Sequence, residues 1–524
     1  MRFSKKYLKK HESGITLIAL IVTIIILLIL AGVAISNLTG SNGLIKKTEI
    51  SKEKTEISIE EEGINIAVTT SRIKDTGYSD LNKNDLQNAI DDQFGNGKVT
   101  VIDNNNGTYD LIMNNGSSRS YTISNDGTIS TEPSNIWNGS NSSEGLYGIG
   151  TDSQPFLIQN SADLAYLRNI VNNNTKIHSL TNSDFDQFDN STTNYQMTTD
   201  LDLNVPDSNW KNWDANTTGL NNWVSIGTYE STTSHTSFKG IFDGNNKKIA
   251  YLYIKCATRC GGLFSNVDGT IKNLTISSGF VQGYGGIGAI VGWACGTDSK
   301  IINCVNNANV CATDSTIGGV AGSIAGLLSE CKNIGTITCT IGTDMGGVTG
   351  YLESTAKIEK CINYGLVKGL NGVGGITGPI IGNSQIQYCV NLGNVSGTDY
   401  VGGISATTRD TSKISNCYNV GIVNGLTRIG GISGLGWEQS NITNCYNVGK
   451  INGNSYVGGI IGNIYSSSNS SNCYFLNTSC SYSTGGISKT DSEMKSQNLL
   501  ELLGTGNWKF VSNKNNGYPV LIFE

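Results

Sequence analysis

Two consecutive stretches decide the fold: ISNCYNVGIVNGLTRIGGISGLGWEQSN over residues 414–441 and ITNCYNVGKINGNSYVGGIIGNIYSSSN over residues 442–469. The two stretches have the same length, and they share an I-x-x-C motif, an asparagine two residues after the cysteine and a later Gly-Gly pair. Self-similarity at a fixed period of about 28 residues is typical of repeat architectures. The cysteine recurs in seven copies, with nearly constant separations along the chain: Cys304, Cys331, Cys361, Cys389, Cys417, Cys445 and Cys473.

Other positions of the repeat keep the same period. A Gly-Gly pair begins at residues 318, 346, 374, 402, 430 and 458. Before the first cysteine copy, Ile271-x-x-Leu274 places a leucine at the cysteine position. The asparagine two residues after the cysteine occurs in six copies: Asn306, Asn333, Asn363, Asn391, Asn419 and Asn447.

The repeat contains three short apolar runs bounded by Gly or Asn, and none is long enough for a helix. Such a unit cannot close a core alone but can do so by stacking on its neighbours. We therefore predict a mainly β fold, a β-solenoid with about three strands per coil of about 28 residues and coils about 4.8 Å apart. Residues 250–490 would then form eight or nine coils, in a rod about 40 Å long.

Each repeat position has an expected place in a coil. The cysteines should form an interior apolar column with the isoleucines, because free cysteine behaves as a small hydrophobe. The asparagines should form a column at one corner, with side-chain amides hydrogen-bonded from coil to coil. Glycines should occupy turns that require a positive φ or a close approach of backbones.

The composition agrees with a folded repeat array and excludes several classes. The chain of 524 residues has 65 glycines but only 5 prolines, which excludes collagen and proline-rich disorder. A hydrophobic share of 38% is too high for a disordered chain. The net charge of −6, without a basic domain, argues against nucleic acid as a partner.

A second motif within the repeat carries a family resemblance. Gly319-Val320-Ala321-Gly322, Gly347-Val348-Thr349-Gly350 and Gly375-Ile376-Thr377-Gly378 resemble the GLUG repeat of bacterial surface and secreted proteins. The resemblance implies a GLUG-type solenoid over residues 256–490. It also implies a lead-in with an N-terminal cap over 156–255 and a C-terminal cap over 491–524.

The N-terminus has the pattern of a membrane segment. Five basic residues within the first ten precede Ile15–Ile35, which contains no charge. Twenty-one helical residues span about 32 Å, enough for the hydrocarbon core of a bilayer, and the basic side should stay cytoplasmic. A cleaved secretory signal and a plain membrane anchor are alternatives.

Gly14-Ile15-Thr16-Leu17-Ile18 resembles the N-terminus of type IV pilins and pseudopilins. The resemblance implies a leader over residues 1–14, cleavage after Gly14 by a prepilin peptidase and methylation of Ile15. It also implies a helix over 15–75 that leaves the membrane and becomes amphipathic, with other pilin subunits as possible partners. Ala19 replaces the glutamate usual in the family, which resembles minor or initiating subunits, or an anchor that never polymerises.

Between the membrane segment and the repeats, residues 76–130 predict a small α+β head. A helix is expected over 81–94, followed by strands over Lys98–Asp103, Thr108–Met113 and Arg119–Ser124 with Asn-Gly turns. Residues 131–155, rich in Ser, Asn and Gly, are expected to form a linker.

Thirteen cysteines in an exported protein raise the question of disulfides. We expect the repeat column to consist of mostly reduced, buried thiols. Cys311 with Cys339, and Cys256 with Cys260, are the pairs that could oxidise. No zinc site is expected at residues 256–260, because no histidine lies near, and no cofactor is expected.

The search for catalytic residues finds none. All three histidines lie outside the array, and the chain contains no H-E-x-x-H, G-x-S-x-G or phosphate-binding loop motif. Lys357, Glu359 and Lys360 form a charged group, interpreted as a solvated face. Three tyrosines directly follow repeat cysteines and could contact a glycan or pack at a corner: Tyr418, Tyr446 and Tyr474.

These observations favour a non-enzymatic bacterial surface protein. It would be a pilin-like anchor or a minor or tip subunit, with its C-terminal region outside the cell membrane. Its β-solenoid would serve adhesion or bind a glycan, host or matrix ligand. The alternatives are a polysaccharide-degrading β-helix enzyme and a purely structural envelope protein.

Overall fold

The computed structural model describes residues 59–74, 77–78, 81–103, 107–113, 120–124, 126–130, 136–182, 186–231, 233–257, 259–353 and 355–524. They belong to two compact units, a smaller one that ends at Ser130 and a larger one from Thr131 to Glu524. The predicted leader and membrane segment, with Gly14, Ile15 and Ala19, lie outside the described residues. Within the part of the chain that is described, no helix has the length and apolarity needed to cross a membrane.

The smaller unit is an α+β fold, as the hydrophobic pattern indicates. Residues 59–72 are helical, and β1 (Ile73–Lys74) pairs with β2 (Gly77–Tyr78). The side chain of Asn82 caps α3 (Lys83–Phe94) by accepting a hydrogen bond from the Asp85 N–H at 3.0 Å. A four-stranded sheet follows in the order β3 (Val99–Asp103), β4 (Thr108–Met113), β5 (Ser120–Ser124) and β6 (Ile129–Ser130).

These elements match the predicted helix and three strands to within two residues, and β6 is an additional strand. The apolar sides of the two helices and the sheet share one core, because hydrophobic residues recur at helical spacing in the helices and alternate in the strands. This core contains Ile64, Leu86, Ile90, Val101, Leu111 and Ile123.

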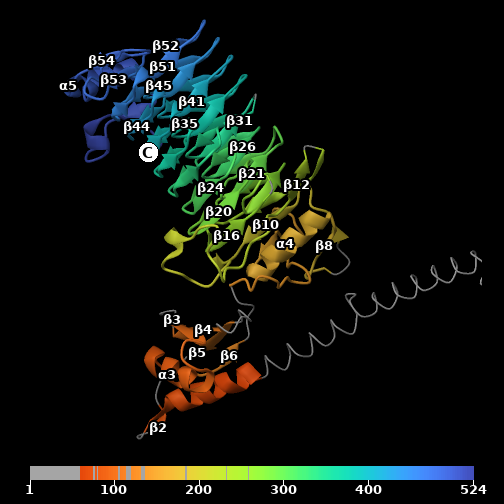
Figure 1. Ribbon diagram of the computed structural model, residues 1–524. Coiled ribbons are helices and arrows are strands. Elements are labelled where there is room, and N and C mark those ends of the chain that lie inside the picture. Colours follow the sequence, from red (N-terminus) through yellow and green to blue (C-terminus); the bar gives the residue numbers. More distant parts are fainter. Residues whose placement is uncertain are drawn as a thin grey trace, which may run out of the picture. The chain divides into compact units, whose positions relative to one another are not determined.

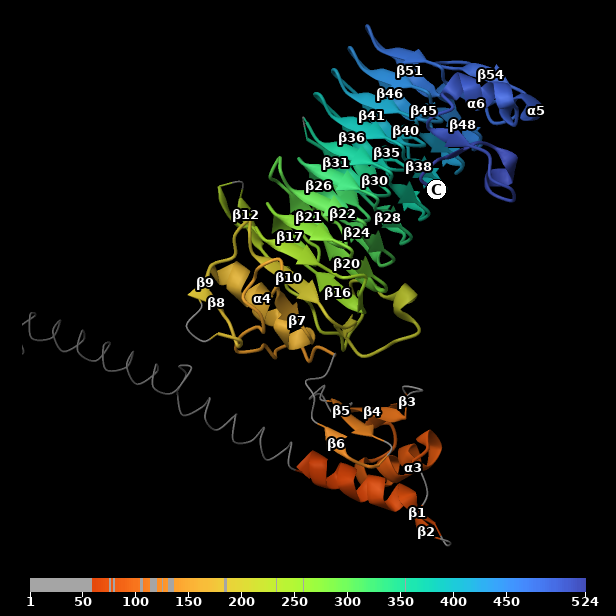
Figure 2. The ribbon, with the colours of Figure 1, turned by 180° about the vertical axis from the view of Figure 1, so that it is seen from behind.

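The larger unit is a parallel β-solenoid of about eight turns (Figures 1 and 2). The turns contribute short strands to five parallel sheets, which we number in the order in which the chain passes through them. Turns between Lys300 and Ile464 have one strand in each of the five sheets, whereas the earlier turns lack a strand in the fourth sheet. The first sheet has eleven strands. They are β7 (Phe156–Ile158), β10 (Asn194–Met197), β14 (Ile241–Asp243), β18 (Thr270–Lys272), β22 (Lys300–Ile302), β27 (Leu327–Ser329), β32 (Lys357–Glu359), β37 (Gln385–Gln387), β42 (Lys413–Ser415), β47 (Asn441–Thr443) and β52 (Asn469–Ser471).

The second sheet also has eleven strands and carries the asparagine column. They are β11 (Leu201–Asp202), β15 (Lys248–Ala250), β19 (Thr275–Ile276), β23 (Val305–Asn306), β28 (Lys332–Asn333), β33 (Ile362–Asn363), β38 (Val390–Asn391), β43 (Tyr418–Asn419), β48 (Tyr446–Asn447), β53 (Tyr474–Leu476) and β54 (Ile487–Lys489). The third sheet contains β16 (Leu252–Lys255), β20 (Gly279–Gly283), β24 (Asn309–Ala312), β29 (Ile337–Cys339), β34 (Val367–Lys368), β39 (Val395–Ser396), β44 (Val423–Asn424) and β49 (Ile451–Asn452).

The fourth and fifth sheets lie on either side of the Gly-Gly pair. The fourth contains β25 (Ile317–Gly318), β30 (Met345–Gly346), β35 (Asn371–Gly374), β40 (Asp399–Gly402), β45 (Thr427–Gly430) and β50 (Ser455–Gly458). The fifth contains β17 (Phe264–Val267), β21 (Val291–Ala294), β26 (Ala321–Ile324), β31 (Thr349–Leu352), β36 (Thr377–Ile380), β41 (Ser405–Thr408), β46 (Ser433–Gly436) and β51 (Ile461–Ile464).

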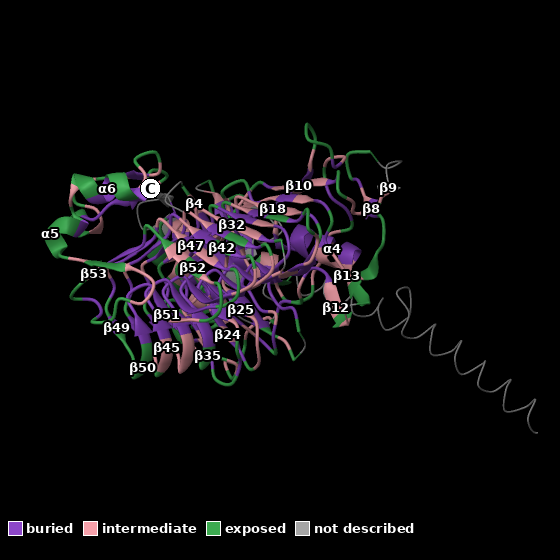
Figure 3. Ribbon diagram, turned by 90° about the horizontal axis from the view of Figure 1, so that it is seen from above, coloured by how far each residue is buried: buried purple, intermediate pink, exposed green. Residues whose placement is uncertain are grey.

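The prediction of three strands per coil is therefore wrong, although the solenoid and its repeat period are confirmed. The apolar runs are subdivided by bends. For example, Asn416 has a φ of 51° and separates β42 from β43. Seen from above, the strands enclose a buried interior and exposed bends lie at the rim (Figure 3).

Close approach of the coils, rather than positive φ, accounts for the repeat glycine Gly403. Its φ is not in the left-handed region, but a Cβ at this position would lie 2.1 Å from the carbonyl oxygen of Gly431 in the next coil. Positive φ is instead adopted by the residue before each repeat cysteine, which is never glycine: Asn303, Glu330, Lys360, Tyr388, Asn416, Asn444 and Asn472.

Part of the expected linker packs against the start of the solenoid. Within residues 131–155, the expected linker, Trp137 is buried against Trp223 with ring centroids 4.9 Å apart, and Leu146 is also buried. The parallel sheets begin at β7, inside the predicted lead-in. The helix α4 (Ser161–Asn173) lies at the start of the stack, and its apolar side joins the interior core (Figures 1 and 2).

Three short elements complete the N-terminal part of this unit. The strand β8 (Ile177–His178) pairs with β9 (Asp186–Gln187), and a 3-10 turn, η1, spans Trp210–Asn212. The strand β12 (Thr228–Ser231) pairs antiparallel with β13 (Ser234–Thr236) to form a hairpin.

The C-terminal segment covers a side of the solenoid as well as following its end. The helices α5 (Asp491–Met494) and α6 (Gln497–Leu503) and the pair β55 (Trp508–Lys509) and β56 (Val520–Leu521) pack on outward side chains of the second sheet. The last strands of the third and fourth sheets are hydrogen-bonded by residues 479–484, a segment that precedes the predicted cap. The Ile451 N–H donates to the Ser479 carbonyl at 3.0 Å, and the Gly459 N–H donates to the Tyr482 carbonyl at 2.9 Å. Much of the capping predicted for 491–524 therefore comes from residues 479–484.

We predict that Gly403→Ala lowers the free energy of unfolding by about 3 kcal/mol, because the new methyl group overlaps a backbone carbonyl that cannot move alone. Urea unfolding followed by circular dichroism measures the change. Gly506→Ala is the matched control, because no atom lies within 4 Å of its Cβ position. Equal unfolding midpoints for the two variants would contradict the role assigned to close packing of the coils.

Candidate ligand-binding surface

The cysteine column lies in the interior, as predicted. Six of its seven members have no exposed surface and Cys473 is 2% exposed, and all seven are free thiols. Burial raises the pKa of the Cys304, Cys361 and Cys417 thiols well above the usual value, so they stay protonated at neutral pH. Leu274 is buried at the equivalent position in the preceding turn. The column is therefore a packing element.

The asparagine column forms a buried ladder of side-chain amides. Each Nδ2 donates to the Oδ1 of the asparagine in the next coil, at 2.7–2.9 Å, from Asn306 as far as Asn447. Each Nδ2 also donates to the backbone carbonyl two residues later, as in the 2.8 Å bond from Asn391 to Gly393. At the end of the ladder, Asn447 donates to the Ser479 hydroxyl at 3.3 Å. The predicted corner column is present, and its amides point into the protein.

The structure places the three tyrosines under the C-terminal segment. Tyr418, Tyr446 and Tyr474 are at most 3% exposed, and the first two rings stack with centroids 4.9 Å apart. The Tyr418 hydroxyl donates to both carboxylate oxygens of Glu524 at 3.0 Å, and the Tyr446 hydroxyl donates to the Pro519 carbonyl. Corner packing is therefore the interpretation that fits, and a ligand cannot reach these rings while the segment covers them.

The disulfide candidates do not form. Cys311 pairs in register with Thr338, whereas Cys339 pairs with Ala312, so the two cysteines point to opposite faces of the third sheet. Both are free, and so is Cys260, the predicted partner of Cys256. Cys339 lies one residue beyond the position that pairs with Cys311, and this offset can be recognised only from the strand register.

The charged group at residues 357–360 is satisfied by ion pairs. Lys357 Nζ lies 2.6 Å from Glu359 Oε2, and Lys360 Nζ lies 3.0 Å from Glu330 Oε1 in the preceding coil. The lysines and glutamates are partly or well exposed, in agreement with the interpretation as a solvated face. Throughout the described ranges, no group of three or more His, Cys, Asp or Glu side chains is arranged to hold a metal ion.

An exposed row of large side chains follows the strands of the fifth sheet. Arg409, Trp437 and Tyr465 recur at the repeat period and occupy the same position in consecutive coils. The Arg409 guanidinium lies 5.5 Å from the centroid of the Trp437 ring, and the Trp437 and Tyr465 centroids are 6.0 Å apart. Trp437 is 40% exposed and Tyr465 is 43% exposed.

A second row, at the start of the fourth sheet, has the same spacing. It consists of Tyr400, Arg428 and Tyr456, all with positive φ, and Tyr456 is 56% exposed. The Arg428 guanidinium lies 4.1 Å from the Tyr400 ring centroid, and its Nε donates to Asp399 Oδ1 at 2.8 Å. This hydrogen bond to Asp399 raises the pKa of Arg428.

The two rows lie close enough to form one surface. Strands of the fourth sheet pack against the fifth-sheet strand of the following coil, as β45 does on β51, and Arg428 interacts electrostatically with Tyr465. We call this surface the aromatic face, defined by Tyr400, Arg409, Arg428, Trp437, Tyr456 and Tyr465. The motif search overlooked it, although the same period that located the cysteines would have aligned both rows.

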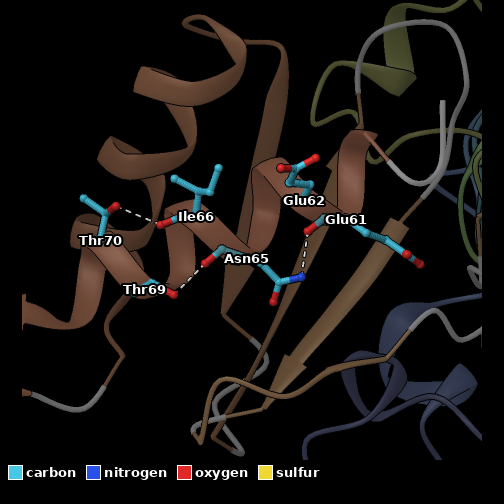
Figure 4. Close-up of a pocket in the computed structure, with 6 residues that line it drawn as sticks. All are labelled: Glu61, Glu62, Asn65, Ile66, Thr69 and Thr70. Carbon is cyan, nitrogen blue, oxygen red and sulfur yellow. Dashed lines mark hydrogen bonds between the residues drawn. The ribbon is translucent and has the colours of Figure 1, made fainter. Parts of the chain in front are cut away.

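The smaller unit has a largely polar helix face that we do not interpret as a ligand-binding site. Its six residues are Glu61, Glu62, Asn65, Ile66, Thr69 and Thr70 (Figure 4). Asn65 Nδ2 donates to the Glu61 carbonyl at 2.9 Å, and Thr69 and Thr70 donate to carbonyls one turn back at 2.8 Å. These donors therefore serve the helix's own backbone.

Comparison with known proteins adds little to the geometry. No protein-family model matches this chain, and no curated protein matches it. A crystal structure of a candidate immunoglobulin A1 protease from Bacteroides ovatus resembles the chain with a TM-score of 0.41 and 20% identity, over 72% of this chain and 95% of that one. The similarities to pilins and to GLUG repeats therefore remain resemblances of motifs.

We predict that Asn391→Ala lowers the free energy of unfolding by about 3 kcal/mol, because it leaves the buried Asn363 amide without its acceptor and Asn419 Oδ1 without its donor. Asn454→Ala, at an exposed position, should change it by less than about 0.5 kcal/mol. Urea unfolding of both variants provides the measurement. A loss no larger at Asn391 than at Asn454 would rule out an energetic role for the ladder.

Proposed function

We propose that this protein is a non-enzymatic surface protein whose solenoid binds an extended glycan along the aromatic face. The observation that carries the proposal is the row of Arg409, Trp437 and Tyr465 at one position of consecutive coils, with two of its rings about two-fifths exposed. Large exposed aromatics at regular spacing have no packing role in the solenoid interior, and exposed apolar surface of this kind marks interaction sites.

The chemistry of the face favours a carbohydrate. Aromatic rings offer flat apolar surfaces to the C–H faces of sugar rings, while guanidinium groups and the tyrosine hydroxyls can hydrogen-bond to sugar oxygens. Consecutive coils are about 4.8 Å apart, close to the length of one sugar residue in an extended chain. Asp399 neutralises Arg428, so the face does not require an acidic ligand.

The rigidity of the solenoid supports this role. Its strands and asparagine ladder fix the spacing of the rows before a ligand arrives, so little conformational entropy is lost on binding. Free thiols in the interior and ion pairs on the flanks leave the aromatic face as the surface best suited to recognition. For attachment to the cell, we propose that the pilin-like N-terminus anchors the chain in the membrane, with the solenoid outside.

We predict that the double variant Trp437→Ala with Tyr465→Ala weakens glycan binding at least about tenfold, because two stacking surfaces are lost together. Affinity electrophoresis of the full chain in gels containing neutral or acidic polysaccharides measures the retardation. The matched control is Tyr147→Ala with Tyr482→Ala, which removes two exposed tyrosines elsewhere. Equal retardation of both double variants, or no retardation of the wild type by any polysaccharide, would refute the proposal.

The anchor is tested separately. We predict that the mature chain isolated from its native membrane begins at Ile15 with a methylated amino group, because the sequence around Gly14 resembles a prepilin cleavage site. Mass spectrometry of the N-terminal peptide identifies the first residue. An intact Met1, or a start near Ser36, would contradict processing as a pilin.

A further inference from the structure

A pocket lies on the fifth sheet several coils before the aromatic face. Trp293 on β21, Ser323 on β26 and Tyr351 on β31 are aligned in register on consecutive strands. Because adjacent strands are about 4.8 Å apart, the two aromatic residues are about 10 Å apart with a small serine between them. This large–small–large order leaves a slot, and a pocket of about 160 Å³ occupies it.

The hairpin of β12 and β13 forms one wall of this pocket. It lies beside the fifth sheet near β17 and β21 (Figures 1 and 2). It places Tyr229 edge-on to Trp293, with centroids 5.8 Å apart, and His235 lies 6.4 Å from the same ring. Since the hairpin is not part of the repeat, the other described coils lack this wall.

The polar groups of the pocket are held in position before any ligand binds. Glu353 Oε1 accepts hydrogen bonds from Trp293 Nε1 at 2.7 Å and from the Ser323 hydroxyl at 3.3 Å. The Arg259 guanidinium lies 3.2 Å from Asp314 Oδ2 and lines the pocket together with the aromatic wall. A carboxylate can accept about four hydrogen bonds and a guanidinium can donate five, so both groups have capacity for a ligand.

The combination of groups favours a neutral ligand. A cationic ligand would meet the Arg259 guanidinium, and an anionic one would meet the carboxylate of Glu353, while Asp314 already pairs with Arg259. A pyranose ring offers an apolar face to Trp293 and hydroxyl groups that both donate to Glu353 and accept from Arg259. Burial raises the pKa of Cys260 to about 12, so its thiol is not a nucleophile and the pocket is suited to reversible binding.

We propose that this pocket, which we call the Trp293 pocket, binds a single neutral pyranose ring. The ligand class rests on the proposed glycan-binding function, but the residues are distinct from those of the aromatic face. The Trp293 pocket would hold one end of a glycan or a branch sugar. The aromatic face would hold an extended part of a chain.

Saturation-transfer difference NMR on the full chain tests the proposal, with the methyl glycosides of glucose, galactose, mannose and N-acetylglucosamine as probes at millimolar concentration. Wild-type protein should transfer saturation to at least one of them. Ser323→Phe, which fills the slot, should reduce that signal at least tenfold. Glu353→Gln keeps the shape and should weaken binding less. Ser396→Phe is the matched control, on an outward position of the third sheet, and should bind as the wild type does.

Several results would overturn the proposal: no signal from any of the four glycosides, an unchanged signal in Ser323→Phe, or saturation of tetramethylammonium in place of the sugars. Thermal unfolding of each variant by circular dichroism separates loss of the slot from loss of the fold. If Ser323→Phe unfolds, Trp293→Phe, which keeps a ring but removes the N–H bonded to Glu353, should also weaken the signal. Wild-type retention by polysaccharides without any glycoside signal would leave the proposed function standing and refute the Trp293 pocket.

Discussion

The distance between coils is the constraint on which the rest of the structure depends. In a solenoid every side chain stacks on its counterpart in the next turn, so any group that does not fit at a spacing of about 4.8 Å repeats its misfit along the stack. The buried asparagine ladder fits this spacing, because each side-chain amide donates a hydrogen bond to the asparagine in the next coil and accepts one from the asparagine in the previous coil. Gly403 fits the same spacing because it has no side chain, and the adjacent backbone leaves no space for a methyl group. The residue at each interior position is therefore determined by the need to stack on the same residue type in the next coil as much as by hydrophobicity.

This constraint also separates the parts of the repeat that can vary from those that cannot. The interior positions keep Ile, Cys and Asn, whereas the position that carries Arg409, Trp437 and Tyr465 carries Glu353 and Ile381 in earlier coils. Outward positions are free to change because their neighbours along the stack need only avoid a clash. Binding surfaces in such a protein arise as columns whose chemistry changes from coil to coil. The aromatic face and the Trp293 pocket are two such regions, both on the fifth sheet and the residues that border it.

The period, the interior column and the amide corner could be predicted from the sequence, since each depends on residue type at a fixed spacing. The small α+β unit was also predictable, because Asn-Gly pairs punctuate the sequence between its strand-like runs. The number of strands per coil was not, because bends at Asn416 and its equivalents need positive φ in residues other than glycine. The burial of Tyr418 and Tyr446 was not predictable either, since a segment much later in the chain covers them. Cys311 and Cys339 required strand register, and the Trp293 pocket required a hairpin that has no counterpart in the repeat.

The absence of disulfides within the repeat column has a consequence for how such a chain can evolve. Coils joined only by stacking and hydrogen bonds can be gained or lost as whole repeats, because no covalent link ties one turn to a particular partner. A duplication of residues 414–441 would insert a turn whose asparagine, cysteine and glycines all meet their own kind on both sides. It would also lengthen the exposed aromatic row by one residue. Recombination within the gene could thus adjust the reach of the surface in steps of a single turn without redesigning the interior.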